Sequence, residues 1–152
     1  MHLFIGPEFV VTIRHADKPD LAEVRRRMEQ NPELLAHGPE AVLYAVLDEV
    51  VDGYGPVIAR LENDTDEIED QLLFRGDPTV TRRIYQLFGE VIDFQRATGP
   101  LPGMLEALMR GSDEHQIDVE LQRLLGDVLD HVLRTGERAD SFRALLHSSG
   151  SC

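Results

Sequence analysis

The sequence predicts a mainly α fold with an α+β remnant, in which a short N-terminal β-hairpin is followed by long antiparallel helices. β-branched and aromatic residues gather in the first 15 positions, and no second strand-rich region follows. Later apolar residues recur every three or four positions, which is the period of a helix. We expect one fragment of a domain over residues 1–152, with a hairpin at 1–15, a helical region at 20–147 and a tail at 148–152.

Composition narrows the function classes. The chain has 152 residues, 42% of them hydrophobic, and a net charge of −13 from 28 acidic and 15 basic side chains. Such an excess of acid argues against a nucleic-acid surface and makes cations the expected charged partners. The lone cysteine, Cys152, permits neither an intrachain disulfide nor a Cys-based zinc site, and it fits a reducing compartment. No signal peptide or membrane-length apolar run is present, so the chain as given is expected to be soluble.

The N-terminal hairpin comes first along the chain. Two β-rich runs, residues 3–5 and 9–14, flank the turn signal Gly6-Pro7-Glu8. A two-stranded hairpin is marginal alone in water, so it must pack on helices or complete a sheet with strands from elsewhere. We therefore expect the chain to be cut from something longer.

Two helix starts follow the hairpin. Asp20 can cap a helix over residues 21–30, which Asn31 and Pro32 stop. Pro39 then suits the first turn of the next helix.

The apolar stripe of that next helix runs from Leu43 to Leu72, with one step missing at Asp64. Its phase is unbroken across the two glycines and the proline at 53–56, which predicts one helix over residues 40–74 with a kink at Pro56.

Two further breaks divide the rest of the chain. The first, at residues 76–78, precedes a helix with a stripe from Val80 to Phe94, and the second, at 98–103, precedes a short helix over 104–109. The last helix is expected over residues 114–147. Its predicted seam consists of Ile117, Leu121, Leu124, Val128, His131 or Val132, Thr135, Phe142 and Leu145.

Several candidate sites fail on spacing. The acidic run at 62–70 does not match an EF-hand, because starting from Asp64 the sixth and twelfth places hold Glu69 and Arg75; a solvated helix face is favoured. The six histidines lack zinc spacing, and His131 is expected to pack between helices. Because no nucleophile, base and oxyanion site come together, we expect no enzyme activity.

Two carboxylate pairs remain. Asp48 and Asp52 share a face of the long helix, and Asp127 and Asp130 share a flank of the last one. One explanation for such pairs is that both carboxylates are simply solvated. The other is that a hard divalent cation, which needs only one or two carboxylates, offsets the repulsion between them.

The chain resembles the cytoplasmic domain of CorA-type magnesium and cobalt transporters along nearly its whole length. The motifs that carry the resemblance are collinear, and they are residues 9–14, 24–27, 43–54, 68–69, 100–101, 126–131 and 141–143. The resemblance implies the last strands of an α/β domain, a pair of long antiparallel helices and the start of a stalk helix. It also implies membrane helices with a Gly-Met-Asn signature after Leu146; Gly103-Met104 is followed by Leu105 and is not that signature. The tail from His147 departs from the family pattern and fits a truncation or an artificial addition.

The resemblance further implies a homopentameric membrane protein whose cytoplasmic domains bind Mg²⁺ between neighbours and so stabilise a closed pore. Asp127 matches the stalk carboxylate of that regulatory site and Asp48 a further carboxylate near it, while their usual acidic partners precede this chain. The expected ligand is Mg²⁺ or Co²⁺, bound weakly, and the fragment alone is expected to be a monomer or a non-native dimer. The alternative hypothesis is a free-standing helical module that dimerises or docks a partner helix.

Overall fold

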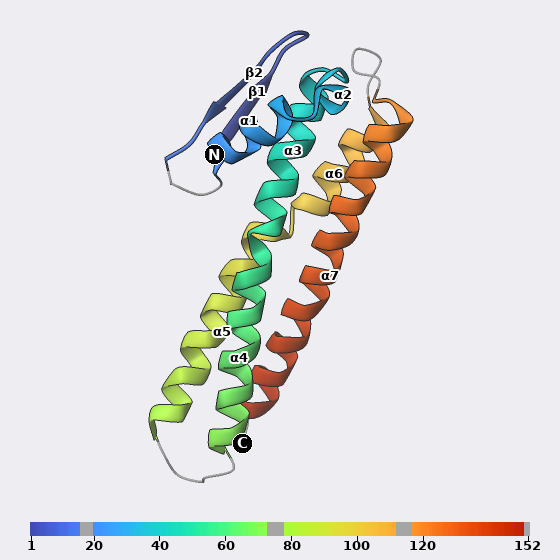
Figure 1. The fold of residues 1–152 in the computed structure, drawn as a ribbon. Coiled ribbons are helices and arrows are strands. Elements are labelled where there is room, and N and C mark those ends of the chain that lie inside the picture. Colours follow the sequence, from blue (N-terminus) through green and yellow to red (C-terminus); the bar gives the residue numbers. More distant parts are fainter. Residues whose placement is uncertain (16–19, 73–77, 112–116, 151–152) are drawn as a thin grey trace. The chain divides into compact units, whose positions relative to one another are not determined.

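The computed structural model describes residues 1–15, 20–72, 78–111 and 117–150 (Figure 1). Its elements in chain order are β1 (His2–Ile5), β2 (Val10–Ile13), α1 (Leu21–Glu29), α2 (Pro32–Leu35), α3 (Pro39–Asp52), α4 (Tyr54–Leu72), α5 (Pro78–Thr98), α6 (Leu101–Arg110) and α7 (Val119–Gly150). They form two compact units, and the predicted mainly α fold is confirmed. The first unit holds residues 1–53 and 103–131, and the second holds 54–102 and 132–152. Among the described helices, none combines the length and the apolar character needed to cross a membrane.

The predicted hairpin is present in the first unit. Strands β1 and β2 pair antiparallel, with Phe4 opposite Val11, and both strands contact α3. Alternation of side chains turns Leu3 toward the helices and leaves Phe4 and Val11 exposed. The hairpin therefore packs on helices, as a two-stranded sheet must to be stable.

Side-chain caps define the helices that follow. The Asp20 carboxylate accepts hydrogen bonds from the amides of Ala22 (3.0 Å) and Glu23 (3.3 Å), which confirms the predicted start of α1. Helix α2, a single turn that begins at Pro32 and is capped by Asn31, was not predicted. The core of this unit includes Val24, Met28, Ala41, Ala45, Val46 and Leu121.

The long helix predicted over residues 40–74 is assigned as two helices, α3 and α4, on either side of Gly53. Gly53 itself has right-handed helical dihedrals, and its amide still donates to the Glu49 carbonyl over 3.2 Å. The interruption lies three residues before Pro56, because proline has no amide hydrogen to donate to the Asp52 carbonyl. Positions 73 and 74 of the prediction lie outside the described residues.

The second unit consists of α4, α5 and the C-terminal part of α7 (Figure 1). Helices α4 and α5 pack together and run in opposite directions. The core shared by α4, α5 and α7 includes Ile58, Leu61, Ile68, Ile84, Val91, Ala139, Phe142 and Leu146.

Helix α7 differs from its prediction at both ends. It begins at Val119 rather than 114, because the Asp118 side chain caps the amide of Leu121 at 2.9 Å. It continues to Gly150, so the expected tail at 148–152 begins inside the helix, and residues 151–152 lie outside the described chain. Its buried positions follow a 4-3 alternation and are Leu121, Leu125, Val128, Val132, Thr135, Ala139, Phe142 and Leu146.

Helix α6 begins earlier than predicted, at Leu101 rather than 104. Pro102 is compatible with this start because it lies in the first turn, where amide hydrogens have no partner within the helix. Only Gly99 and Pro100 of the predicted break separate α5 from α6.

Candidate cation site

Asp48, one of the two predicted cation ligands, is held by an arginine. It lies on α3, and its Oδ2 accepts a hydrogen bond from Nη2 of Arg27 on α1 at 3.0 Å. The other arm of the same guanidinium, Nη1, donates to Oε2 of Glu49 at 3.3 Å. The exposed fractions of the three side chains are 38% for Arg27, 28% for Asp48 and 22% for Glu49. The carboxylate predicted to bind a cation therefore already has a cationic partner on the protein.

Asp127, the second predicted ligand, lies on α7 in an open setting. Its side chain is 70% exposed, and its Oδ2 lies 3.9 Å from Nη1 of Arg123, one turn earlier. A pair this exposed and this long contributes little stability, so the carboxylate can turn toward another ligand at small cost.

The charges of both predicted ligands affect the pKa of the Tyr44 phenol. Burial raises the pKa of the Tyr44 phenol above its ordinary value, and the negative charge of Asp48 raises it further. Asp127 and Asp52 also raise this pKa, while Arg27 lowers it. The carboxylates of Asp48 and Asp127 thus both act on one phenol of the same unit.

The remaining members of the two carboxylate pairs have different surroundings. Oδ1 of Asp52 lies 3.5 Å from Nδ1 of His131, which is half-buried rather than part of the buried seam; Val132 takes the seam position. Asp130 is exposed on α7. Asp52 therefore interacts with the histidine that was expected only to pack.

The donor chemistry of this region fits a hard cation, because Mg²⁺ prefers carboxylate oxygens and keeps most of its waters. Within the described ranges, however, no three His, Cys, Asp or Glu side chains are grouped closely enough to hold a metal ion. Asp48 and Asp127 remain predicted ligands that could supply one or two oxygens to a hydrated ion.

A second charged cluster, which was not predicted from the sequence, surrounds His37. The imidazole lies between two acids near the start of α7: Nδ1 contacts Oδ2 of Asp118, and Nε2 lies 3.3 Å from Oε2 of Glu120. The amide of Leu121 and then His37 lower the pKa of the Asp118 carboxyl. No sequence signal could have found this cluster, because His37 and Asp118 are 81 positions apart.

The acidic run at 62–70 belongs to the second unit and carries ion pairs with arginines. Glu62 pairs with Arg138 of α7, and Glu67 pairs with Arg83 of α5 at 2.9 Å. The side chains at both ends of these pairs are at least 37% exposed. The exposed acids agree with the solvated, acidic helix face expected from the failed EF-hand spacing, and their ion pairs with arginines are an addition to it.

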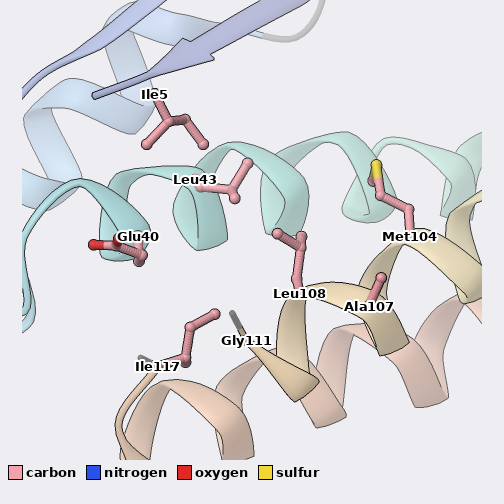
Figure 2. Close-up of a pocket in the computed structure, with 8 residues that line it drawn as sticks. All are labelled: Ile5, Glu40, Leu43, Met104, Ala107, Leu108, Gly111 and Ile117. Carbon is pink, nitrogen blue, oxygen red and sulfur yellow. The ribbon is translucent and has the colours of Figure 1, made fainter. Parts of the chain in front are cut away.

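An apolar pocket of about 320 Å³ lies within the first unit (Figure 2). Figure 2 shows Leu43 of α3 facing Leu108 of α6, with Ile5 and Ile117 at the edges and Glu40 at one end. With a single carboxylate among its lining residues, the pocket suits an apolar occupant rather than a metal ion. It does not include Asp48 or Asp127.

A family model described as CorA-like Mg²⁺ transporter protein matches residues 1–149. The chain belongs to this family. The resemblance found in the sequence is therefore confirmed at the level of the family, which favours the transporter hypothesis over a free-standing helical module.

Curated relatives of this CorA-like chain are longer proteins. YfjQ of Bacillus subtilis (strain 168), a protein named for metal ion transport, is 28% identical over 141 residues, which are 93% of this chain and 44% of the relative. The cobalt/magnesium transport protein CorA of Thermotoga maritima is 24% identical over 124 residues, which are 81% of this chain and 35% of that protein. The CorA-like chain thus spans less than half the length of each.

A solved structure has the same fold. The CorA magnesium transporter from Methanocaldococcus jannaschii superposes with a TM-score of 0.76 at 22% sequence identity. The match covers 98% of the CorA-like chain and 47% of that structure. The fold of this chain is therefore shared with a solved CorA structure.

Proposed function

We propose that the chain is the cytoplasmic, Mg²⁺-sensing part of a homopentameric divalent-cation channel, and that Asp48 and Asp127 contribute to a weak regulatory site for Mg²⁺ or Co²⁺. The family match over residues 1–149 carries the proposal. The names of the Thermotoga and Methanocaldococcus proteins supply the substrate class, magnesium and cobalt. The membrane part of the channel is proposed to follow α7.

The physical scheme is a linkage between ion binding and the spacing of domains. Carboxylates brought together between neighbouring domains repel each other, and a divalent cation that binds them offsets the repulsion. Loss of the ion restores the repulsion and favours the state in which the domains are apart. The ion shifts this equilibrium because it binds more tightly to the state in which the domains are close together. The net charge of −13 strengthens this dependence on cations.

The test is a calorimetric titration of the chain with MgCl₂ and with CoCl₂, comparing Asp127→Ala with wild type. Asp93→Ala is a matched control, because Asp93 is also exposed on a helix (80%) and lies 3.8 Å from Arg96, one turn away. We expect weak binding that Asp127→Ala removes and Asp93→Ala preserves.

An identical response of wild type and Asp127→Ala would remove Asp127 from the site and leave the family assignment intact. Light scattering at several concentrations, with and without MgCl₂, tests the association of domains. A strict monomer under every condition would show that the chain alone does not assemble.

A further inference from the structure

We propose that Arg27 is a resident counter-ion of the candidate cation site, which holds the Asp48 carboxylate until a divalent cation displaces it and so sets the affinity for that cation. The inference rests on the proposed function, because it takes Asp48 as a cation ligand. It assigns a regulatory role to a residue that belongs to neither carboxylate pair.

The geometry of the guanidinium carries the first step. Its two arms reach two adjacent acids of α3, Asp48 at 3.0 Å and Glu49 at 3.3 Å, so one planar group spans both carboxylates. Arginine presents its donors in a fixed fork, which makes such a double contact favourable. With Arg27 38% exposed and both acids less exposed than that, water screens this contact less than it screens a fully exposed pair.

Competition follows from the charges. A metal ion and a guanidinium bound to the same carboxylate repel each other, and Mg²⁺ requires oxygen ligands at about 2.0–2.1 Å in near-octahedral geometry. An Asp48 oxygen that accepts the Arg27 hydrogen bond at 3.0 Å must turn or release that donor before it can bind the ion closely. The arginine therefore lowers the affinity of the site.

The Tyr44 phenol provides a second observation. Asp48, Asp127 and Asp52 raise the pKa of Tyr44, and Arg27 lowers it. At the Tyr44 phenol, the positive charge of Arg27 thus offsets part of the negative potential of the three carboxylates, which would attract a divalent cation. The Arg27–Asp48 ion pair and the effect of Arg27 on the pKa of Tyr44 both indicate that Arg27 weakens the binding of a divalent cation.

A matched control lies two residues away on the same helix. Arg25 pairs with Glu29 at 2.8 Å, with side chains 81% and 59% exposed. Arg25→Gln removes the same charge from α1 as Arg27→Gln does, without touching the Asp48 contact. Comparing the two variants separates displacement of a bound counter-ion from a general effect of net charge.

The experiment is calorimetric titration with MgCl₂ and CoCl₂ of wild type, Arg27→Gln, Arg25→Gln, Asp48→Asn and the Arg27→Gln/Asp48→Asn double variant, each checked by circular dichroism. We expect Arg27→Gln to tighten binding about fivefold, the upper range for a partly exposed ion pair. Arg25→Gln should change the affinity by less than about twofold, since that pair is exposed. The Arg27→Gln/Asp48→Asn double variant should not show the tighter cation binding expected of Arg27→Gln. Arg27→Lys, which keeps the charge and loses the fork, should give a smaller gain and serves if Arg27→Gln misfolds.

The outcomes separate this inference from the proposed function. Equal affinities for Arg27→Gln and Arg25→Gln, with wild-type binding lost in Asp48→Asn, would overturn the role of Arg27 and uphold the site. Wild-type binding that survives Asp48→Asn would overturn Asp48 as a ligand, and with it the inference. Absence of binding in wild type and in Arg27→Gln would overturn both.

Discussion

The guanidinium of Arg27 on α1 donates to the carboxylate of Asp48 on α3 over 3.0 Å. Asp48 stands 21 positions after Arg27 in the sequence, so the contact depends on the packing of α1 against α3. The same ion pair stabilises the first unit and occupies a predicted cation ligand.

Arg27→Gln is therefore expected to weaken the fold slightly while it frees Asp48. We expect a loss of about 1 kcal/mol or less in the free energy of unfolding, because the pair is only partly shielded from water. Urea unfolding followed by circular dichroism measures it, and the loss should shrink in 1 M NaCl as salt screens the pair. Arg25→Gln, which breaks a more exposed pair, should cost less; a larger loss there would contradict the ranking by exposure.

The ionisation of Tyr44 reports the charge around the predicted ligands. Burial first, and then Asp48, raise the pKa of Tyr44 above its ordinary value of 10.0. Asp48→Asn removes one of the raising charges, so the pKa of Tyr44 should fall toward that value. Tyrosinate absorbance, measured in a Tyr54→Phe/Tyr85→Phe background, follows this phenol alone. An unchanged or higher pKa in Asp48→Asn would show that Asp48 does not act on Tyr44.

Folding stability should respond to the same phenol at high pH. Because the folded chain keeps the Tyr44 proton to a higher pH than the unfolded chain, the stabilisation is complete below about pH 10 and is lost as pH rises from there through the folded pKa. Tyr44→Phe cannot ionise, so its stability should fall less steeply above pH 10. Burial also raises the pKa of Tyr54, so part of the fall in stability with pH should remain in both wild type and Tyr44→Phe.

Asp118 should control stability at the acid end. The Leu121 amide and His37 lower the pKa of Asp118 below its ordinary value of 3.8, so the ionised form adds stability above that value and loses it as pH falls through the lower, folded pKa. Asp118→Asn keeps a side chain able to cap α7 and removes the charge, whereas Asp118→Ala removes both.

Thermal unfolding at pH 7 should therefore rank wild type above Asp118→Asn and Asp118→Asn above Asp118→Ala. Wild type and Asp118→Asn should converge as the pH falls through the folded pKa of Asp118. Asp93→Asn, at an exposed position of α5, is the control and should follow wild type. Convergence of Asp118→Ala with wild type at pH 7 would show that the cap does not stabilise α7.

The sequence was sufficient to predict elements whose signals are local. The hairpin turn, the Asp20 cap and the apolar stripes depend on residues a few positions apart, and the structure has each of them. The contacts around the candidate site join distant residues, Arg27 to Asp48 and His37 to Asp118, and helical period alone does not specify which side chains meet across a helix pair. The ligand assignment of Asp48 and Asp127 came from the family resemblance and stays a prediction.

The buried positions of α7 were predicted only in part from the spacing of its apolar residues. Its predicted seam ended at Leu145, yet Leu145 is 42% exposed and Leu146 is 1% exposed. The buried positions keep a regular alternation of four and three through Ala139, a small residue that the prediction skipped. The predicted seam is off by one position at Leu124 and at Leu145. Each of these has an adjacent leucine, Leu125 or Leu146, that is buried instead, and a step of three or four residues does not distinguish the two neighbours.

The missing step in the predicted stripe of the long helix has a similar explanation. Thr65 occupies it: this side chain is 2% exposed between the core positions Leu61 and Ile68. Its hydroxyl donates to the Leu61 carbonyl at 2.7 Å, so a polar group is buried with its hydrogen bond made. The apolar stripe has a gap at Asp64 in the sequence because threonine is not an apolar residue type.

Thr65→Val is expected to leave the stability unchanged or to raise it slightly. The Leu61 carbonyl keeps the helical hydrogen bond from the amide of residue 65, so removing the hydroxyl leaves no buried acceptor unpaired, and valine fills nearly the same volume. Thr65→Ala should cost about 1–2 kcal/mol because it opens a cavity, and Leu61→Ala about 2–5 kcal/mol. Urea unfolding of the three variants, with the half-exposed Leu145→Ala as the control, measures the order. A loss in Thr65→Val as large as that in Thr65→Ala would mean that the hydroxyl, rather than the methyl group, stabilises the second unit.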